Sequence, residues 1–194
     1  MQNKWVSLGE GDRVFGRACL RAAAVASAVA LAGCGLLGGR AALRQSNSQV
    51  MTVTSPEFGQ GRAIPRQYTC RDRHETPPVS WSGAPLGTRA LALVVDDTDA
   101  PITPYVYWIV FNINPQITDI QANRLPPGAL QAVNSRGTVG YAPPCPSHGH
   151  EYRFTIYALN ASLRLKEGAS LTAAVSGIAS HALARGRLTG VITP

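Results

Sequence analysis

Two short segments of the chain carry the side chains best suited to chemistry. The first is Asp97–Pro101, where two carboxylates stand two residues apart directly after an apolar run. Paired aspartates can bind a cationic group, but Asp side chains also cap turns by accepting hydrogen bonds from nearby backbone N–H groups. Both interpretations stay open at this stage. A calcium loop of the EF-hand type is excluded, because Pro101 takes the fifth position and no glycine takes the sixth.

The second segment, Gly137–Tyr152, is rich in glycine and proline and carries two histidines and two tyrosines. Such residues fix an irregular backbone, and converging N–H groups of an irregular backbone can bind anions. Cys145, His148 and His150 could hold zinc, but a structural zinc site needs four well-spread ligands and these three are packed closely. We therefore expect neither a metal nor a cofactor.

Short strands should position both segments. Nineteen glycines and fourteen prolines indicate many turns, which favours a mainly β fold. Tyr105–Ile113 is the best strand candidate, because it is rich in aromatic and β-branched residues. The other expected strands are Met51–Ser55, Val79–Trp81, Leu91–Asp96 and Tyr152–Leu159.

A change of hydrophobic period near the C-terminus predicts one helix. Ser170 is its candidate N-cap, and apolar residues follow at helical spacing. This helix should end near Gly186. The region Asn114–Ser135 has weak periodicity and predicts a long surface loop.

The composition fits one globular domain. The chain has 194 residues, of which 45% are hydrophobic and 15% are charged, so a disordered chain is excluded. The formal net charge is +7, but the arginines are scattered singly and form no basic run interleaved with aromatic residues. We therefore expect no nucleic-acid partner.

The N-terminal residues are typical of an export signal. The apolar run Ala22–Ala32 follows a positively charged stretch and is too short to span a bilayer. It leads into Leu31-Ala32-Gly33-Cys34, which resembles a bacterial lipobox, whose cysteine is diacylated after cleavage before it. An ordinary secretory signal with a chance cysteine is the alternative. We expect a lipoprotein signal peptide at 1–33, a flexible tether at 34–49 and the folded domain at 50–194. Cys34 would anchor the protein to the extracytoplasmic face of the cell membrane.

Cys70 and Cys145 are the cysteines left in the predicted domain. An even pair in an oxidising compartment suggests a disulfide. Two buried free thiols are the alternative, because the sequence does not fix the distance between the two Cα atoms.

Several segments, taken in order, resemble the phosphatidylethanolamine-binding protein family, which includes the Raf kinase inhibitor-like proteins. The resemblance implies a β-sandwich of two antiparallel sheets with a C-terminal helix. It also implies a small pocket for phosphate-like anions such as the phosphatidylethanolamine head group. The resembling segments are Ile64–Cys70, Thr76–Trp81, Pro85–Thr88, Asp97–Pro101, Trp108–Ile113 and Gly140–Ala158. Carried over by position, the pocket residues would be Asp97, Asp99, Tyr107, Tyr141, Pro144, His150 and Tyr152.

Three positions depart from the family pattern, and two of them, Tyr107 and Glu151, make this pocket less cationic. Thr98 replaces a proline, Tyr107 stands where a pocket histidine is frequent, and Glu151 stands where arginine is usual. An anion would be repelled by Asp97 and Asp99 unless histidine, carboxyl protonation or a cationic part of the ligand neutralised them. We therefore expect an anionic or zwitterionic ligand, with a zwitterion such as phosphoethanolamine as plausible as a bare anion.

A binding protein is favoured over an enzyme. The chain has no Gly-x-Ser-x-Gly nucleophile motif, which counts against an α/β-hydrolase. A weak hydrolase that uses an Asp–His pair as general base is one alternative. An envelope protease inhibitor or another partner-binding protein is the other.

Overall fold

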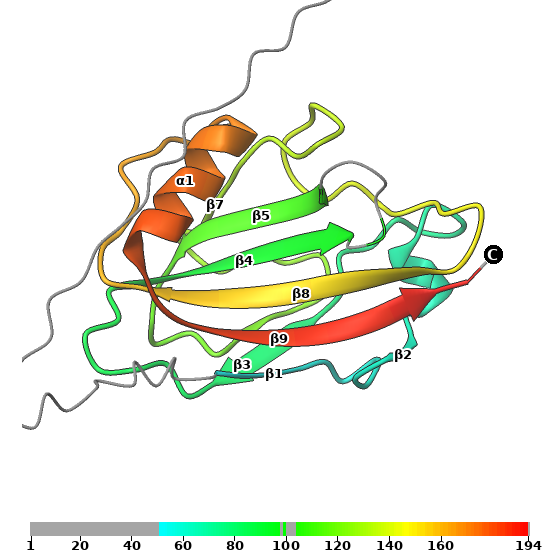
Figure 1. Ribbon diagram of the computed structural model, residues 1–194, viewed down its shortest axis with the longest axis horizontal. Helices are drawn as coiled ribbons and strands as arrows, with labels where there is room; N and C mark the ends of the chain where they lie inside the picture. Colours follow the sequence, from blue (N-terminus) through cyan, green and yellow to red (C-terminus); the bar gives the residue numbers. More distant parts are fainter. Residues whose placement is uncertain (1–50, 98, 100–103, 194) are drawn as a thin grey trace, which may run out of the picture. The chain divides into compact units, whose positions relative to one another are not determined.

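The computed structural model describes residues 51–97, 99 and 104–193. The predicted signal peptide, the tether, Cys34 and Thr98 lie outside these residues. Within them, the strands form two sheets with one α-helix near the C-terminus (Figure 1). The mainly β prediction is confirmed. No helix of the described part of the chain has the length and apolarity needed to cross a bilayer.

The smaller sheet has the strand order β1-β3-β6, and the larger has the order β2-β9-β8-β4-β5-β7. Neighbouring strands are antiparallel, apart from the parallel pair β2 and β9. The strands are β1 (Thr52–Thr54), β2 (Arg62–Ala63), β3 (Val79–Ser82), β4 (Ala90–Asp97), β5 (Tyr105–Ile113), β6 (Asp119–Ile120), β7 (Leu130–Gln131), β8 (His150–Leu159) and β9 (Ala182–Ile192).

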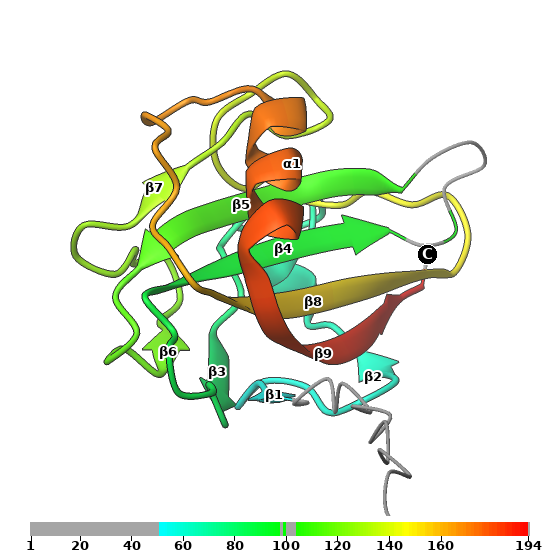
Figure 2. The same cartoon turned by 60° about the vertical axis from the view of Figure 1, so that its left-hand side comes forward.

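The centre of the larger sheet is buried on both faces. One face packs against the smaller sheet, through a cluster that joins Trp81 of β3 to Phe154 of β8. The other face packs against helix α1 (Leu171–His181), whose Ala174 and Ile178 are buried (Figure 2). Because both faces are covered, β4 is a nearly continuous apolar run rather than an alternating one.

The helix prediction is right at its start and wrong at its end. The Ser170 hydroxyl accepts a hydrogen bond from the backbone N–H of Ala173 at 3.3 Å, as expected of an N-cap. The helix ends at His181, and β9 begins at the next residue. The predicted stretch up to Gly186 is therefore strand, because it pairs with β8 along its length. Val175, one of the apolar residues that follow Ser170 at helical spacing, is 43% exposed.

The predicted surface loop Asn114–Ser135 contains regular structure. It supplies β6, which pairs with β3, and β7, which pairs with β5. Ile120, Ala132 and Asn134 are buried. The region escaped prediction because its strands are only two residues long, too short to show a hydrophobic period.

Candidate functional site

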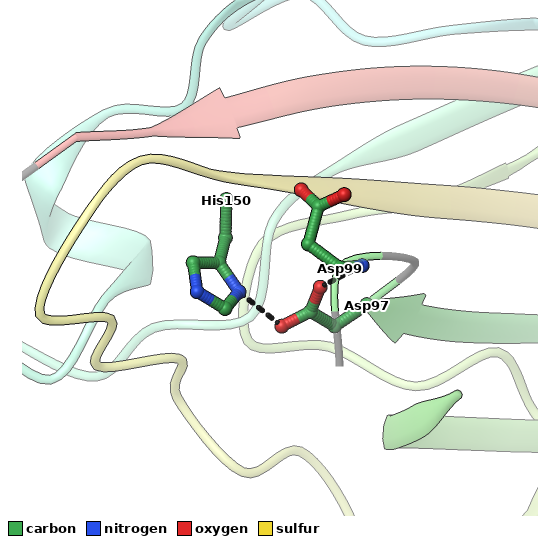
Figure 3. Close-up of side chains that lie close together, drawn as sticks. All are labelled: Asp97, Asp99 and His150. Atoms are coloured by element: carbon green, nitrogen blue, oxygen red, sulfur yellow. Dashed lines mark hydrogen bonds and ion pairs between the residues drawn. The ribbon is translucent and has the colours of Figure 1, made fainter. Parts of the chain in front are cut away.

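The ends of two neighbouring strands bring the candidate site together. Strand β4 ends at Asp97 and the antiparallel β8 begins at His150, so both ends meet at one edge of the larger sheet. The register pairs Asp97 with Tyr152, which places their side chains on the same face. His150 lies two residues before Tyr152 and shares that face. Figure 3 shows His150 pointing toward Asp97, with Asp99 beside them.

Asp97 is a buried carboxylate with two defined partners. Its side chain is 4% exposed. One oxygen, Oδ2, lies 2.7 Å from Nδ1 of His150, and the other accepts a hydrogen bond from the backbone N–H of Asp99 at 2.8 Å (Figure 3). These contacts fix the orientation of both the carboxylate and the imidazole. The turn-capping interpretation is therefore confirmed for Asp97, which also orients a histidine, and binding of a cationic group stays a prediction.

Asp99 ties the segment after β4 to the start of β8. Its Oδ2 accepts a hydrogen bond from the backbone N–H of Glu151 at 2.8 Å. Asp99 is exposed, and ligand atoms of Asp97, Asp99 and His150 lie within 4.8 Å of one another. The site thus concentrates two carboxylates around one imidazole.

Two tyrosines lie beside the Asp97–His150 pair. The rings of Tyr107 and Tyr152 lie 5.4 Å apart, edge to face. Burial raises the pKa of both hydroxyls, and the nearby Asp97 carboxylate raises them further. Both side chains therefore stay protonated near neutral pH and can donate hydrogen bonds. The hydroxyl of Tyr107 is the neighbour of the buried Tyr152 hydroxyl, but no described residue meets the distance and angle of a hydrogen bond to it.

Tyr141 and Pro144 hold the neighbouring loop in place. The Tyr141 hydroxyl donates to the backbone carbonyl of Tyr68 at 2.7 Å, and the Pro144 carbonyl accepts from the backbone N–H of Cys70 at 3.0 Å. The Cys70–Cys145 disulfide reinforces the same connection, with a Cα–Cα distance of 5.3 Å. The disulfide alternative is thereby confirmed over free thiols. For Tyr141 and Pro144 the contacts found are structural, and contact with a ligand stays a prediction.

His148 and Ser147 belong to the site, although sequence reasoning did not include them in it. Nε2 of His148 lies 3.0 Å from Nε2 of His150, and Nδ1 of His148 lies 3.0 Å from Oγ of Ser147. The spacing His-Gly-His was a usable signal, because residues two apart on an extended strand share one face. From the sequence, the two histidines suggest only a zinc site that includes Cys145.

Arg153 does not contribute positive charge to the site. Its guanidinium pairs with the Asp96 carboxylate, and this pairing raises the pKa of Arg153. Arg153 and Asp96 are neighbours of Tyr152 and Asp97 in their strands, so their side chains point to the opposite, helix-covered face of the sheet. The positive charge of Arg153 is therefore not available to Asp97 and Asp99.

Comparison with known proteins agrees with this geometry. The family model described as phosphatidylethanolamine-binding protein matches residues 54–193. The chain belongs to the phosphatidylethanolamine-binding protein family. The match spans both sheets, α1 and the Asp97–His150 pair, so the resemblance seen in the sequence is confirmed together with its fold.

Two known proteins resemble this chain over most of their length. A UPF0098 protein of Methanothermobacter thermautotrophicus is 39% identical, over 73% of this chain and 97% of its own. Lipoprotein LppC of Mycobacterium tuberculosis is 38% identical, over 90% of this chain and 95% of its own. Because LppC is named as a lipoprotein, this similarity suggests membrane association.

Two solved structures of the family have the same fold. The homologue CT736 of Chlamydia trachomatis superposes with a TM-score of 0.69 and 33% identity, over 76% of this chain and 99% of its own. YbcL of E. coli, described as a member of the mammalian family, superposes with a TM-score of 0.70 and 27% identity, over 74% and 98%. The predicted sandwich with a helix near the C-terminus is thus confirmed.

Proposed function

We propose that this protein is a lipid-anchored, extracytoplasmic binding protein whose site takes a small phosphate-containing zwitterion of the phospholipid head-group type. One observation carries this proposal. The oriented Asp97–His150 pair, with Asp99 beside it, lies on the same face as the buried hydroxyl of Tyr152, which has no hydrogen-bond partner in the described part of the chain. A ligand that fits must therefore satisfy negative charge at one end and hydrogen-bond donors at the other.

The carboxylates favour a ligand with a cationic group. Asp99 is exposed and has one oxygen engaged by the backbone of Glu151, so its carboxylate can also receive an ammonium group. A bare phosphate would instead meet two negative charges at close range and be repelled. A zwitterion removes this repulsion, because its amine neutralises the carboxylates.

The phosphate end of the ligand would meet the hydroxyl donors of Tyr107 and Tyr152. The raised pKa of Tyr107 and Tyr152 keeps their hydroxyls protonated, so each can donate to a phosphate oxygen. The Tyr152 hydroxyl gains most, because a buried donor without a partner costs about 1–3 kcal/mol until it is satisfied.

Isothermal titration calorimetry with phosphoethanolamine, choline phosphate and inorganic phosphate tests this assignment. Asp99→Asn should weaken phosphoethanolamine binding about tenfold, by the loss of one charge-assisted contact. The same substitution should leave the affinity for inorganic phosphate unchanged or raise it. Asp119→Asn is the matched control, because Asp119 lies on β6 in the other sheet. Equal losses for all three ligands would refute an amine-specific role for Asp99.

The anchor in this proposal is Cys34. Two acyl chains hold a protein stably on a membrane, whereas one gives only marginal binding. The name of the relative LppC supports this part of the proposal. Labelling cells with radioactive palmitate should mark the wild-type protein and Cys19→Ser but not Cys34→Ser. Label retained in Cys34→Ser would contradict the anchor.

We further propose that the site binds without turnover. Purified protein should release no product from chromogenic esters or phosphoesters beyond the background of a His150→Ala variant. Turnover that disappears in His150→Ala would instead identify a hydrolase that uses the Asp–His pair as a general base.

A further inference from the structure

Two imidazole rings meet at the start of β8. His148 and His150 flank Gly149, and their ring centroids lie 4.5 Å apart. Their Nε2 atoms face each other at 3.0 Å. Two ring nitrogens at this distance must share a proton or a metal ion, because two lone pairs would repel each other.

The second nitrogen of each ring already has a partner that fixes it. Nδ1 of His150 lies 2.7 Å from the buried carboxylate of Asp97, and Nδ1 of His148 lies 3.0 Å from Oγ of Ser147. An ionised carboxylate only accepts hydrogen bonds, so this contact assigns the proton of a neutral His150 ring to Nδ1 and leaves a lone pair on Nε2. His148 reaches the same tautomer when its Nδ1–H donates to Ser147.

We propose that His148 and His150 bind one divalent transition-metal ion, such as zinc, through their Nε2 atoms. Zinc–nitrogen bonds of about 2.0–2.1 Å at a tetrahedral angle separate the two nitrogens by about 3.3 Å, so the pair needs to open only slightly. The ion takes the place of the hydrogen between the two Nε2 atoms, and His148 stays neutral by carrying its proton on Nδ1, toward Ser147 Oγ. Asp97 and Ser147 are positioning residues, since metal-binding histidines characteristically donate the other ring N–H to such a partner.

The surroundings of the histidine pair suit a metal ion. His148 is exposed and His150 is half-buried, so an ion can reach both Nε2 atoms. The Asp97 and Asp99 carboxylates next to His150 favour a cation there. Two histidine ligands leave coordination positions open to water or to an oxygen anion.

The sequence alone led to the expectation that the protein binds no metal. That expectation took Cys145 as the third zinc ligand, but Cys145 is bonded to Cys70. The third member of the cluster is instead Asp97, which comes from another strand and orients a ligand. The site extends beyond the proposed zwitterion function and can be tested without any phosphate ligand.

Calorimetric titration of zinc chloride into the purified, chelator-treated protein tests the proposal. The full lipid-anchored protein is used in detergent, without a histidine tag. Wild type should bind one equivalent of zinc. His148→Gln and His150→Gln should each weaken binding at least about tenfold, whereas His181→Gln is the matched control, because its ring contacts Asn160 elsewhere. Absence of zinc binding by wild type, or binding as tight as that of wild type in either site variant, would overturn the proposal.

Long-range ¹H–¹⁵N spectra of the imidazole rings test the ligand atoms directly. Zinc should shift Nε2 of His148 and His150 and leave the rings of His74 and His181 unchanged. Asp97→Asn should weaken zinc binding about 10- to 100-fold and reduce the protonated Nδ1 signal of His150, with circular dichroism confirming that the variant folds. Zinc binding that leaves both Nε2 signals unmoved would refute the site. Unchanged affinity in a folded Asp97→Asn would refute the positioning role of Asp97.

Discussion

Nδ1 of His150 lies 2.7 Å from Oδ2 of Asp97, although 53 residues separate the two in the chain. The antiparallel register of β4 and β8 creates this contact, because it pairs Asp97 with Tyr152 and keeps His150 on the same face. A slip of one residue would turn His150 and Tyr152 to the opposite face. The chemistry of the site therefore depends on the register of β4 and β8. The same residues contribute to the stability of the fold and to the properties of the site.

Tyr152→Phe should stabilise the ligand-free protein while weakening ligand binding. The Tyr152 side chain is 1% exposed and its hydroxyl has no partner among the described residues. Removing an unsatisfied buried group should raise the free energy of unfolding by about 1 kcal/mol. The same change removes a donor for the phosphate of phosphoethanolamine. Urea denaturation measures the first effect and calorimetry the second.

Tyr141→Phe is the matched control for that experiment. The Tyr141 hydroxyl donates to the Tyr68 carbonyl at 2.7 Å, so its removal should lower the free energy of unfolding by about 1 kcal/mol. Opposite signs for the two variants are expected. Equal destabilisation would show that the Tyr152 hydroxyl has a partner in the folded protein.

For the site, the sequence was informative at the positions that match the family pattern. The spacing of Asp97 and Asp99 alone did not separate turn capping from cation binding, and the structure shows capping and histidine orientation together. The spacing His-Gly-His indicated that the two rings are neighbours, but the contact between their Nε2 atoms could not be foreseen, because it depends on ring orientations that Asp97 and Ser147 set. Contacts that depend on side-chain rotation are invisible to spacing arguments.

The sequence predicted strands well where they carry large apolar or β-branched residues. Tyr105–Ile113 coincides with β5 for this reason. Strand β9 was missed, because its inward positions include Ala184, Gly186 and Gly190, which carry little hydrophobic signal. Ala182 also continued the period of the preceding helix. The alternation of these small residues with Arg185 and Arg187 was the available evidence for a strand.

Stability should fall above about pH 10. Burial raises the pKa of Tyr141 and Tyr152 above the ordinary value of 10.0, so the folded state keeps protons that the unfolded state releases. The contribution of these two tyrosines to the free energy of unfolding is fully present below about pH 10. As the pH rises further, the free energy of unfolding falls by up to about 1.4 kcal/mol per pH unit for each tyrosine. Urea denaturation at a series of pH values measures this slope. In Tyr141→Phe the free energy of unfolding should depend less steeply on pH, because one fewer proton distinguishes the folded and unfolded states. An unchanged slope would contradict a raised pKa of Tyr141.

Removing the Cys70–Cys145 disulfide should destabilise the domain strongly. The bond joins residues 75 positions apart, for which the loop-entropy account gives about 4 kcal/mol. The double variant Cys70→Ser/Cys145→Ser should therefore lose about 2–5 kcal/mol in urea denaturation. Reductant should lower the stability of wild type toward that of the variant and leave the variant unchanged. A wild type insensitive to complete reduction would show that the bond adds no stability.

Gly186→Ala should destabilise the protein by preventing the close approach of β9 to the start of β1. A Cβ at position 186 would collide with the backbone carbonyl of Met51, while the Met51 N–H donates to the Arg185 carbonyl at 3.1 Å. Backbone cannot move aside as a flexible side chain can, so the two segments must separate. Overpacking of this kind costs about 1–3 kcal/mol, which a thermal melt followed by circular dichroism should detect.

Gly59→Ala separates this steric effect from the general effect of adding a methyl group to a glycine. A Cβ on Gly59 would meet Arg62 Cγ at 3.6 Å, which is ordinary van der Waals contact. This control should melt at or slightly above the wild-type temperature, because alanine restricts the unfolded chain. Gly186→Ala should melt lower yet bind phosphoethanolamine normally while folded, because Gly186 pairs with Ile156, six residues along β8 from His150. A Gly186→Ala protein as stable as Gly59→Ala would show that β1 and β9 do not pack this closely.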